Sequence, residues 1–302
     1  MKPVFITGPT GIGKTDIAVT LAKEIGADII SADSVQIYRA IGLGSGKPLP
    51  GETKGVRIFL MDHVNPGVYY SAYNFALDVK EALKEIRGGV IVAGGCGLFI
   101  ETLIRGIAPD IPRDERTRKE IKDKAAQSSW GEMRGMLAEV DPAYAGKISP
   151  NDKVRITRAL EIYFLTGRTV SSLETESHGN AVFREYRIFN ITMERKALYE
   201  RIEKRIDGWF DAGWIEEVKN LKEKKVIGDK FRALGFNEIN DFLEGRIHTK
   251  YELIDTVKKH QRNYAKGQIT WFKRYRERID IPMDDGPEKA LEKIKEHLKK
   301  DD

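Results

Sequence analysis

The chain has 302 residues, of which 41% are hydrophobic and 32% are charged, and its net charge is +5. No apolar run approaches the ~20 residues of a membrane-spanning helix, so no membrane role is expected. A single cysteine excludes an internal disulfide, and five scattered histidines argue against a structural zinc site. These numbers predict a globular cytoplasmic protein of one or two domains. The mildly basic charge is compatible with a nucleic-acid partner but by itself describes only a charge-rich surface.

The first 25 residues place a glycine-rich loop between a strand and a helix. An apolar run at 4–6 precedes the loop, and apolar residues recur at helical spacing over 17–25. The pattern G-x-x-x-x-G-K-[ST] is met at every fixed position by the run Gly8, Pro9, Thr10, Gly11, Ile12, Gly13, Lys14 and Thr15. In this context the loop amides, the helix N-terminus and the lysine bind phosphate, and the threonine hydroxyl holds Mg²⁺. The reaction stays open, because kinases, switches, motors and some transferases share this loop.

Strands and helices then alternate, which is typical of a parallel sheet covered by helices. Residues 28–33 and 89–93 are predicted to be strands, 73–86 a helix, and 98–103 the start of another helix after a second glycine turn. Asp33 stands at the tip of its strand, and ligands of open α/β sheets lie beyond the carboxyl ends of the strands. Position alone leaves open whether this carboxylate caps a helix or takes part in catalysis.

Two further features follow the strand that ends at Asp33. A glycine-rich loop over 41–47 ends in Lys47, a cation within reach of a bound phosphate. Residues 58–62 are four apolar residues followed by Asp62, a pattern similar to the strand that carries a magnesium-binding acid in ATPases. Because buried strands often show this pattern, it supports a kinase without establishing one.

The region 113–185 differs from the rest, because it carries almost no strand signal. Its charge-dense start and its apolar periodicity, clearest at 153–166, predict helices. A strand pattern returns at 187–193. We therefore expect an α/β protein with a P-loop NTPase-like parallel sheet covered by helices, formed by 1–112 and 186–302, and an inserted all-helical domain at 113–185.

The last third of the chain is predicted to be mainly helical. A long helix is expected over 195–222, with Gly213 as a candidate break, and a short one over 231–238. A helix over 251–276 interleaves cations with aromatic residues, which suits phosphate neutralisation and base stacking. By itself, an amphipathic helix with buried aromatic side chains is the simpler explanation. A short strand and a charged amphipathic helix are expected over 279–302.

Several of these motifs resemble those of the bacterial tRNA dimethylallyltransferases, P-loop prenyltransferases that modify the adenosine next to the anticodon. The most specific is the P-loop together with the run Ser31-Ala32-Asp33-Ser34-Val35-Gln36-Ile37-Tyr38-Arg39. Weaker motifs follow in the family's order over nearly the whole chain: Lys47-Pro48, Asp62-His63, Gly94-Gly95-Cys96-Gly97-Leu98, Arg158-Ala159-Leu160-Glu161-Ile162-Tyr163, Arg232-Ala233-Leu234-Gly235-Phe236 and Gln268-Ile269-Thr270-Trp271-Phe272.

The resemblance implies transfer of a dimethylallyl group from dimethylallyl diphosphate to N6 of that adenosine in the anticodon stem-loop of tRNA. The P-loop then holds a diphosphate leaving group instead of ATP, and Lys14 and a Mg²⁺ ion on Thr15 stabilise its growing charge. Asp33 matches the family's general base, which accepts a proton from the adenine amine. The resemblance also implies a monomer without an obligatory protein partner.

The remaining site residues are carried over by position. The resemblance assigns contacts with the adenine, its neighbours and the tRNA to Asp33, Ser34, Val35, Gln36, Cys96, Arg118, Arg155 and Arg158. The family usually has threonine where this chain has Cys96, and a thiol is the weaker hydrogen-bond donor. The family commonly has arginine where this chain has Gly267, so the diphosphate contact is expected to pass to Lys266.

Three alternatives stay open. A P-loop small-molecule kinase would use Asp33 as the base on a hydroxyl group and Asp62 on magnesium. A prenyltransferase acting on free adenine nucleotides would need neither the helical insert nor the cationic helix, and both favour a macromolecular acceptor. A nucleotide-gated RNA-binding switch would need a guanine-reading N-K-x-D tetrapeptide, which does not occur in the sequence.

Overall fold

The structure is a computed structural model that describes residues 1–49, 51–107, 110–177, 179–228 and 231–299. By its internal contacts the chain divides into two units. Unit 1 comprises Met1–Tyr70, Leu77–Ile100 and Phe183–Asp302, and unit 2 comprises Ser71–Ala76 and Glu101–Val182. The end of the expected C-terminal helix, residues 300–302, lies outside the described residues. In the part of the chain that is described, no helix is both long and apolar enough to cross a bilayer.

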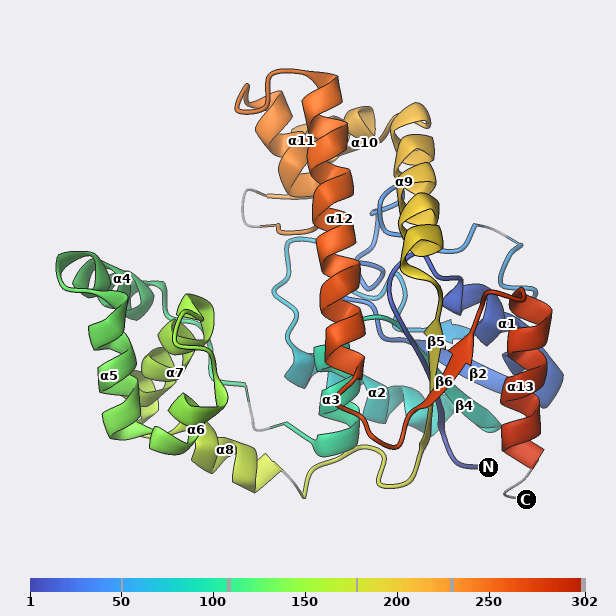
Figure 1. Cartoon of the computed structure of the whole chain (residues 1–302), viewed down its shortest axis with the longest axis horizontal. Helices are drawn as coiled ribbons and strands as arrows, with labels where there is room; N and C mark the ends of the chain where they lie inside the picture. The colour runs from blue at the N-terminus through green and yellow to red at the C-terminus, as the bar shows by residue number, and fades with distance from the viewer. Residues whose placement is uncertain (50, 108–109, 178, 229–230, 300–302) are drawn as a thin grey trace. The chain divides into compact units, whose positions relative to one another are not determined.

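Among the described residues, unit 1 contains a sheet of six parallel strands in the order β3-β2-β4-β1-β5-β6 (Figure 1). Their bounds are β1 Val4–Thr7, β2 Ala27–Ser31, β3 Ile58–Phe59, β4 Gly89–Ala93, β5 Arg187–Thr192 and β6 Ile279–Pro282. Strand β1 is buried along its whole length between β4 and β5, which explains its apolar sequence without alternation. The predicted parallel α/β sheet is confirmed, and its central strand leads directly into the P-loop.

Helices flank this sheet. Their bounds are α1 Lys14–Ile25, α2 Ala72–Glu85, α3 Gly97–Arg105, α9 Arg195–Asp211, α10 Trp214–Glu223, α11 Phe236–Leu243, α12 Lys250–Phe272 and α13 Pro287–Lys299. In Figure 1, α1 packs beside α13, and α9 lies along α12. Buried side chains such as Leu21 of α1, Ile206 of α9 and Val257 of α12 share one core with the strands. Because these apolar faces are buried in the core, the polar faces of the same helices point away from it.

Two helix boundaries depend on glycines with left-handed backbone. The predicted break at Gly213 is confirmed, since φ there is 93° and the segment 195–222 forms α9 and α10 instead of one helix. The predicted helix over 231–238 is wrong in its start, because α11 begins at Phe236, directly after Gly235 with φ 87°. Apolar spacing continues across both turns, so it does not mark where the backbone reverses.

Unit 2 contains α4 Glu115–Gln127, α5 Trp130–Val140, α6 Pro142–Lys147, α7 Lys153–Thr166 and α8 Val170–Ser177. The first four of these helices each begin at a side chain that accepts a hydrogen bond from a first-turn N–H, namely Asp114, Ser129, Asp141 and Asp152. A separate small core holds them together, including Ile121, Met133, Leu137, Ile156 and Leu160. Local capping and this core explain why the segment is helical.

Candidate active site

The P-loop joins β1 to α1 through backbone that glycine adopts without strain. Gly8 has φ 138°, and a Cβ at this position would lie 2.7 Å from the carbonyl oxygen of Ile191 on β5. Gly13 has φ 96° and caps the N-terminus of α1. The loop therefore lies close against the sheet and brings Lys14 to the first turn of α1, where backbone N–H groups favour an anion.

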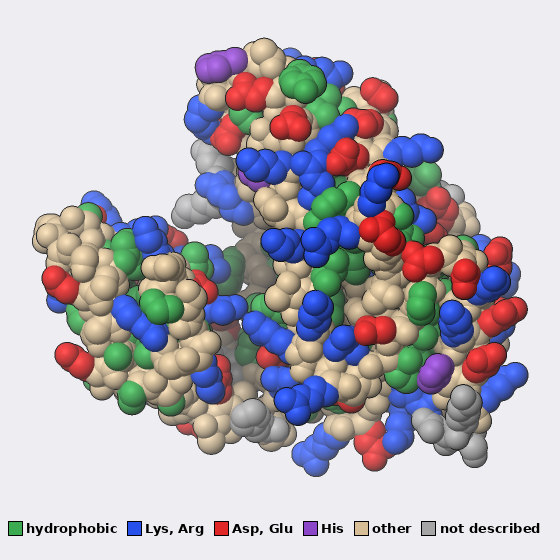
Figure 2. Space-filling view, viewed as in Figure 1, with side chains coloured by type: hydrophobic (Ala, Val, Ile, Leu, Met, Phe, Trp, Pro, Cys, Tyr) green, Lys and Arg blue, Asp and Glu red, His purple; other side chains and the backbone are tan. Residues whose placement is uncertain are grey.

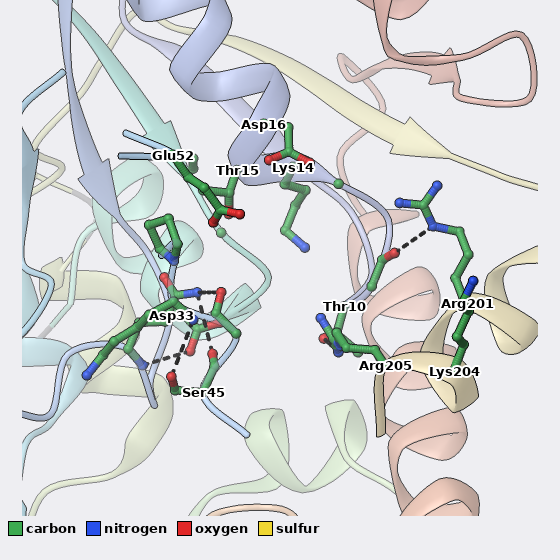
Figure 3. A pocket seen from close by; sticks show the side chains of 18 residues that line it. Thr10, Lys14, Thr15, Asp16, Asp33, Ser45, Glu52, Arg201, Lys204 and Arg205 are labelled. Carbon is green, nitrogen blue, oxygen red and sulfur yellow. Dashed lines mark hydrogen bonds between the residues drawn. The ribbon is translucent and has the colours of Figure 1, made fainter. Parts of the chain in front are cut away.

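A cavity of about 600 Å³ lies at the carboxyl ends of the parallel strands (Figure 3). The P-loop lines one side through Thr10, Gly11, Gly13, Lys14 and Thr15. The other predicted phosphate residues, Gly8, Pro9 and Ile12, are not among the lining residues and shape the loop from behind. The remaining walls come from segments after β2, from the end of β4 and from α9. The sequence therefore predicted the P-loop wall together with Asp33 and Lys47, which also line the cavity, but not the wall from α9.

Lys14 provides a half-buried cation in this cavity. Its Nζ donates a hydrogen bond of 2.8 Å to the carbonyl oxygen of Pro9. Burial lowers the pKa of Lys14 from its ordinary value to about 8, the Asp33 carboxylate opposes this shift, and Arg205 adds to it. A bound anion would stabilise the protonated form of this amine, so the cavity suits a phosphate group.

Helix α9 supplies three cations to the cavity that sequence reasoning missed: Arg201, Lys204 and Arg205 (Figure 3). Arg205 donates from Nη2 to the hydroxyl of Thr10 at 2.8 Å, and Arg201 donates from Nε to the carbonyl oxygen of Gly11 at 3.2 Å. Burial lowers the pKa of Arg205 to about 10. The three cations recur at helical spacing just after a predicted strand, but this signal is also common on solvated helices.

Asp33 lies in the cavity and also caps the turn that follows it. Its Oδ1 accepts hydrogen bonds from the N–H groups of Val35 at 2.8 Å and Gln36 at 3.2 Å. Among the described residues no hydrogen bond to Oδ2 is found. The two interpretations of this residue are therefore compatible, because one oxygen caps the turn and the other remains for a ligand.

The residues after Asp33 differ in their positions. Gln36 lines the cavity, but its Oε1 accepts from the Ser31 hydroxyl at 3.0 Å and its Nε2 donates to the Gly46 carbonyl oxygen at 2.9 Å. Ser34 is exposed and Val35 packs against the core, and neither is among the lining residues. Both polar atoms of the Gln36 side chain thus form hydrogen bonds within the protein. A contact between Gln36 and a nucleic-acid base would require these bonds to rearrange, or it would come from the backbone.

Cys96 lies in the turn between β4 and α3, near Asp33 and Ser34. Burial raises the pKa of its thiol to about 11, and the Asp33 carboxylate contributes in the same direction. The thiol therefore stays protonated at neutral pH, and its reactivity as a nucleophile is low. A protonated thiol in this place is a weak hydrogen-bonding group and nothing more.

Gln268 of α12 braces the cavity from outside. Its Oε1 accepts a hydrogen bond of 2.8 Å from the N–H of Thr10, and its Nε2 donates one of 2.9 Å to the carbonyl oxygen of Gly95. A Cβ at Gly95 would lie 2.2 Å from that Nε2, so a side chain there would displace the Gln268 amide. The neighbouring Lys266 is exposed and is not among the lining residues, so this geometry does not support its predicted diphosphate contact.

The run at 58–62 does not bring a carboxylate to the cavity. Strand β3 ends at Phe59, because Leu60 and Asp62 adopt left-handed φ angles of 59° and 50°. Asp62 forms an ion pair of 2.7 Å with Lys47 and is not among the lining residues. The strand pattern at 58–62 therefore does not bring a magnesium-binding acid to the site, and the main sequence support for the alternative of a kinase is lost.

The three arginines assigned to tRNA lie in unit 2. Arg118 and Arg158 both contact Oε2 of Glu161, at 3.3 Å and 2.9 Å, and this glutamate has an exposed fraction of 0%. Arg155 is more exposed and lies 3.5 Å from a carboxylate oxygen of Asp152. Arg118 and Arg158 thus stabilise unit 2 itself, and Arg155 is the most exposed of the three.

Oxygen atoms suited to Mg²⁺ occur among the lining residues, on Thr15, Asp16, Asp33 and Glu52. Magnesium in phosphate sites is commonly held by one or two protein groups together with phosphate oxygens and water. In the described part of the chain, no cluster of three His, Cys, Asp or Glu side chains forms a dedicated metal cage. The donor set fits a magnesium ion that binds together with a diphosphate, with Thr15 as the expected protein ligand.

The fold and the cavity define a P-loop protein that binds a phosphorylated ligand next to a carboxylate. Residues 36–275 match the protein-family model described as IPP transferase. The chain belongs to this family of transferases, which confirms the resemblance seen in its motifs.

Relatives of this chain carry consistent names. A tRNA dimethylallyltransferase from Thermotoga maritima is 39% identical over 99% of this chain and 97% of its own, and one from Thermosipho africanus is 39% identical over 99% of both. The crystal structure of a full-length tRNA isopentenylpyrophosphate transferase from Bacillus halodurans has a TM-score of 0.71 and 33% identity, covering 98% of this chain and 95% of that one. A eukaryotic dimethylallyltransferase described as acting on tRNA shares the fold, with a TM-score of 0.74, 24% identity, and coverage of 94% of this chain and 75% of that one.

Proposed function

We propose that this protein transfers a dimethylallyl group from dimethylallyl diphosphate to N6 of the adenosine next to the anticodon of tRNA. The observation that carries the proposal is one cavity that combines the Asp33 carboxylate with the half-buried cations Lys14 and Arg205. Family membership makes the protein a prenyl transferase, and relatives with the name of this activity cover nearly the whole chain.

Charge on the leaving group explains the cations. In the transfer step the bond between C1 of the dimethylallyl group and the diphosphate oxygen breaks, and its electron pair leaves with the diphosphate. Lys14, Arg205 and the P-loop amides stabilise this growing negative charge. Mg²⁺ bound with the diphosphate supplies further charge neutralisation. The protein cations are held by the fold before the ligand binds, so they need little reorganisation during the reaction.

The weak nucleophile explains the carboxylate. The new bond joins C1 to N6 of adenine, whose lone pair is delocalised into the ring, and N6 loses a proton as the bond forms. Asp33 accepts this proton, and the N–H groups of Val35 and Gln36 fix the orientation of its carboxylate. The adenine must leave the anticodon stack to reach Asp33, which costs a few kcal/mol.

The contacts with the anticodon stem-loop are proposed on the resemblance and on charge. We assign the helical region 113–185 to tRNA binding, with Arg155 as the most accessible of its three assigned arginines and with contributions from Arg118 and Arg158 that their pairing with Glu161 weakens. In unit 1, we assign the contacts with the target base to Asp33, Ser34, Val35, Gln36 and Cys96, on the resemblance. We place the enzyme in the cytoplasm, active without an obligatory protein partner.

Helix α12 offers unit 1 a second phosphate-binding surface. Lys259, Lys266 and Lys273 are exposed and seven residues apart, which places them on one face of the helix. Figure 2 shows Lys and Arg side chains gathered along this helix. Exposed cations in a row suit an RNA backbone, so we assign Lys266 to tRNA instead of the diphosphate.

The test is incubation of the protein with dimethylallyl diphosphate, Mg²⁺ and unmodified tRNA, followed by digestion of the RNA. Isopentenyl-adenosine is the expected product. Product formed with AMP but not with tRNA would favour a prenyltransferase of free nucleotides. Phosphate transfer from ATP without any prenyl product would favour a kinase, and either result contradicts the proposal.

Asp33→Asn separates catalysis from binding at this site. Asparagine keeps an oxygen that caps the turn, but it cannot accept the N6 proton. Turnover is therefore expected to fall by about 10²–10⁴-fold, while tRNA affinity and the melting temperature stay unchanged. Filter binding and the prenyl-transfer assay measure the two effects, and an equal loss of both would make Asp33 a binding residue.

A further inference from the structure

Residues 41–48, here called the strap, form one wall of the cavity in unit 1. Four consecutive residues of the strap, Ser45 to Pro48, line the cavity. The strap consists of turns without helix or strand, so no ladder of backbone hydrogen bonds fixes its place. Side chains from other elements must therefore hold this wall against the ligand.

Glu217 of α10 holds the start of the strap. Its Oε1 accepts a hydrogen bond of 2.7 Å from the N–H of Gly42, and its Oε2 accepts one of 2.8 Å from the N–H of Leu43. A carboxylate can accept from two consecutive amides in this way, whereas a carboxamide has a single acceptor oxygen. Glu217 is not among the residues that line the cavity, so it acts on the strap and not on the ligand.

Trp214, one turn before Glu217, provides the surface on which the strap rests. A Cβ at Gly44 would lie 2.1 Å from the Trp214 ring, and Gly44 has a left-handed φ of 76°. The ring is completely buried against Phe210 and Phe236, which keep it in place. Helix α10 thus presents a rigid support, and Glu217 fastens the strap to it.

The other end of the strap is joined to the segment that carries Asp33. The carbonyl oxygen of Gly46 accepts a hydrogen bond of 2.9 Å from Nε2 of Gln36. The backbone N–H of the same Gln36 donates to Oδ1 of Asp33 at 3.2 Å. If the strap moves, the cavity wall moves with it. Gln36, whose N–H orients the Asp33 carboxylate, is displaced as well.

We propose that Glu217 is a positioning residue of this site. By holding the amides of Gly42 and Leu43 it fixes the strap, and the strap fixes the wall of the cavity that meets the diphosphate. The identity of the ligand rests on the proposed function. Loss of the Glu217 carboxylate weakens diphosphate binding although no group that contacts the ligand is removed.

Glu217→Gln tests this inference, with Glu216→Gln as the matched control. Glu216 is the exposed neighbour in the first turn of α10, so the control removes the same charge from the same helix. Amide hydrogen exchange over 41–48 and binding of inorganic pyrophosphate with Mg²⁺ are measured first, because neither needs turnover. Glu217→Gln is expected to speed exchange at the strap and to weaken pyrophosphate binding, each about ten-fold, and Glu216→Gln to change neither.

Kinetics distinguish positioning from a loss of folded protein. Glu217→Gln is expected to raise KM for dimethylallyl diphosphate about ten-fold while KM for tRNA changes by less than about two-fold. A smaller folded fraction would lower the apparent kcat and leave KM unchanged. Unchanged exchange over the strap overturns the inference, as does faster exchange with unchanged pyrophosphate affinity.

Two further outcomes keep the test decisive. If Glu217→Gln does not fold, Glu217→Asp makes the same comparison, because its carboxylate is drawn back from the two amides by one methylene group. Wild-type protein that binds pyrophosphate but forms no isopentenyl-adenosine contradicts the proposed function. The exchange and pyrophosphate measurements then still decide the role of Glu217.

Discussion

The arginines of the two units lie in opposite electrostatic surroundings. In unit 2, Arg118 and Arg158 share the buried carboxylate of Glu161, which follows Arg158 by one helical turn. In unit 1, Arg205 lines the cavity, its Nε has no hydrogen-bond partner among the described residues, and burial lowers its pKa. The protein neutralises one group of arginines itself and keeps the other for an anionic ligand.

The acidic residues of α9 explain this difference. Glu203 pairs with Arg262 and Asp207 pairs with Lys258, both on α12. These carboxylates occupy the opposite face of α9 from Arg205, so they bind the neighbouring helix and leave the cavity positive. The placement of the carboxylate, and not the presence of the arginine, decides whether a cation supports the fold or a ligand.

The largest expected effect is on the cluster of unit 2. Glu161→Gln leaves Arg118 and Arg158 without their shared carboxylate, and breaking a buried ion pair costs about 3–5 kcal/mol of unfolding free energy. Denaturant titration of unit 2 measures this change in the free energy of unfolding. Glu174→Gln is the control, because Glu174 forms an exposed pair with Lys147 and its loss costs less than about 1 kcal/mol. Equal effects of the two substitutions would show that the cluster does not stabilise unit 2.

Arg205→Met is expected to affect activity without loss of stability. Removing one cation that stabilises the leaving group lowers kcat/KM by about 10²–10³-fold. The melting temperature stays the same or rises, because the substitution removes a half-buried cation that forms no ion pair with a carboxylate among the described residues. Arg158→Met is the matched variant, and its melting temperature is expected to fall. A similar fall in the melting temperature of Arg205→Met would show that Arg205 stabilises the fold as Arg158 does, which contradicts the comparison.

The lowered pKa of Lys14 predicts a pH dependence of ligand binding. Dimethylallyl diphosphate binds the protonated amine, whose pKa in the free protein is about 8. Affinity is therefore constant below this pH and falls about ten-fold per pH unit above it, until the pKa of the complex is reached. Calorimetry between pH 7 and 10 checks the sign, and Lys14→Met is expected to bind weakly at every pH. An affinity that rises with pH would contradict the prediction.

The smallest expected effect belongs to Arg155. Arg155→Ala is expected to change stability by less than about 0.5 kcal/mol, because its side chain is partly exposed and its ion pair is long. Binding of tRNA is expected to weaken, and the slope of log affinity against log salt to fall by about 1. Arg116→Ala, which removes another exposed arginine of unit 2, is the control. An unchanged slope would show that Arg155 does not contact the RNA.

The sequence predicted those parts of the site whose chemistry depends on neighbours in the chain. The P-loop glycines, Lys14 and Thr15 form one continuous motif, and Asp33 caps the turn made by the residues that follow it. The parallel sheet was predictable for the same reason, because apolar runs and glycine turns alternate. Local pattern was sufficient wherever the partner of a residue lay within a few positions.

Contacts between distant segments could not be predicted. Glu217 acts on the N–H groups of Gly42 and Leu43, and no spacing rule connects α10 with that loop. Gly235 is another example, since a Cβ there would lie 1.9 Å from the Trp214 ring. This contact explains why the segment before Phe236 turns where apolar spacing predicts helix.

Gln268 has a consequence for synthesis of the chain. It satisfies the N–H of Thr10, in a loop synthesised long before α12, and it also holds Gly95. Strand β1 likewise acquires its neighbours β4 and β5 only after long intervals. The most recognisable motif of the protein therefore leaves the ribosome before the segments that complete its binding site. A nascent chain that ends before α12 carries the complete phosphate signature without the brace that aligns it.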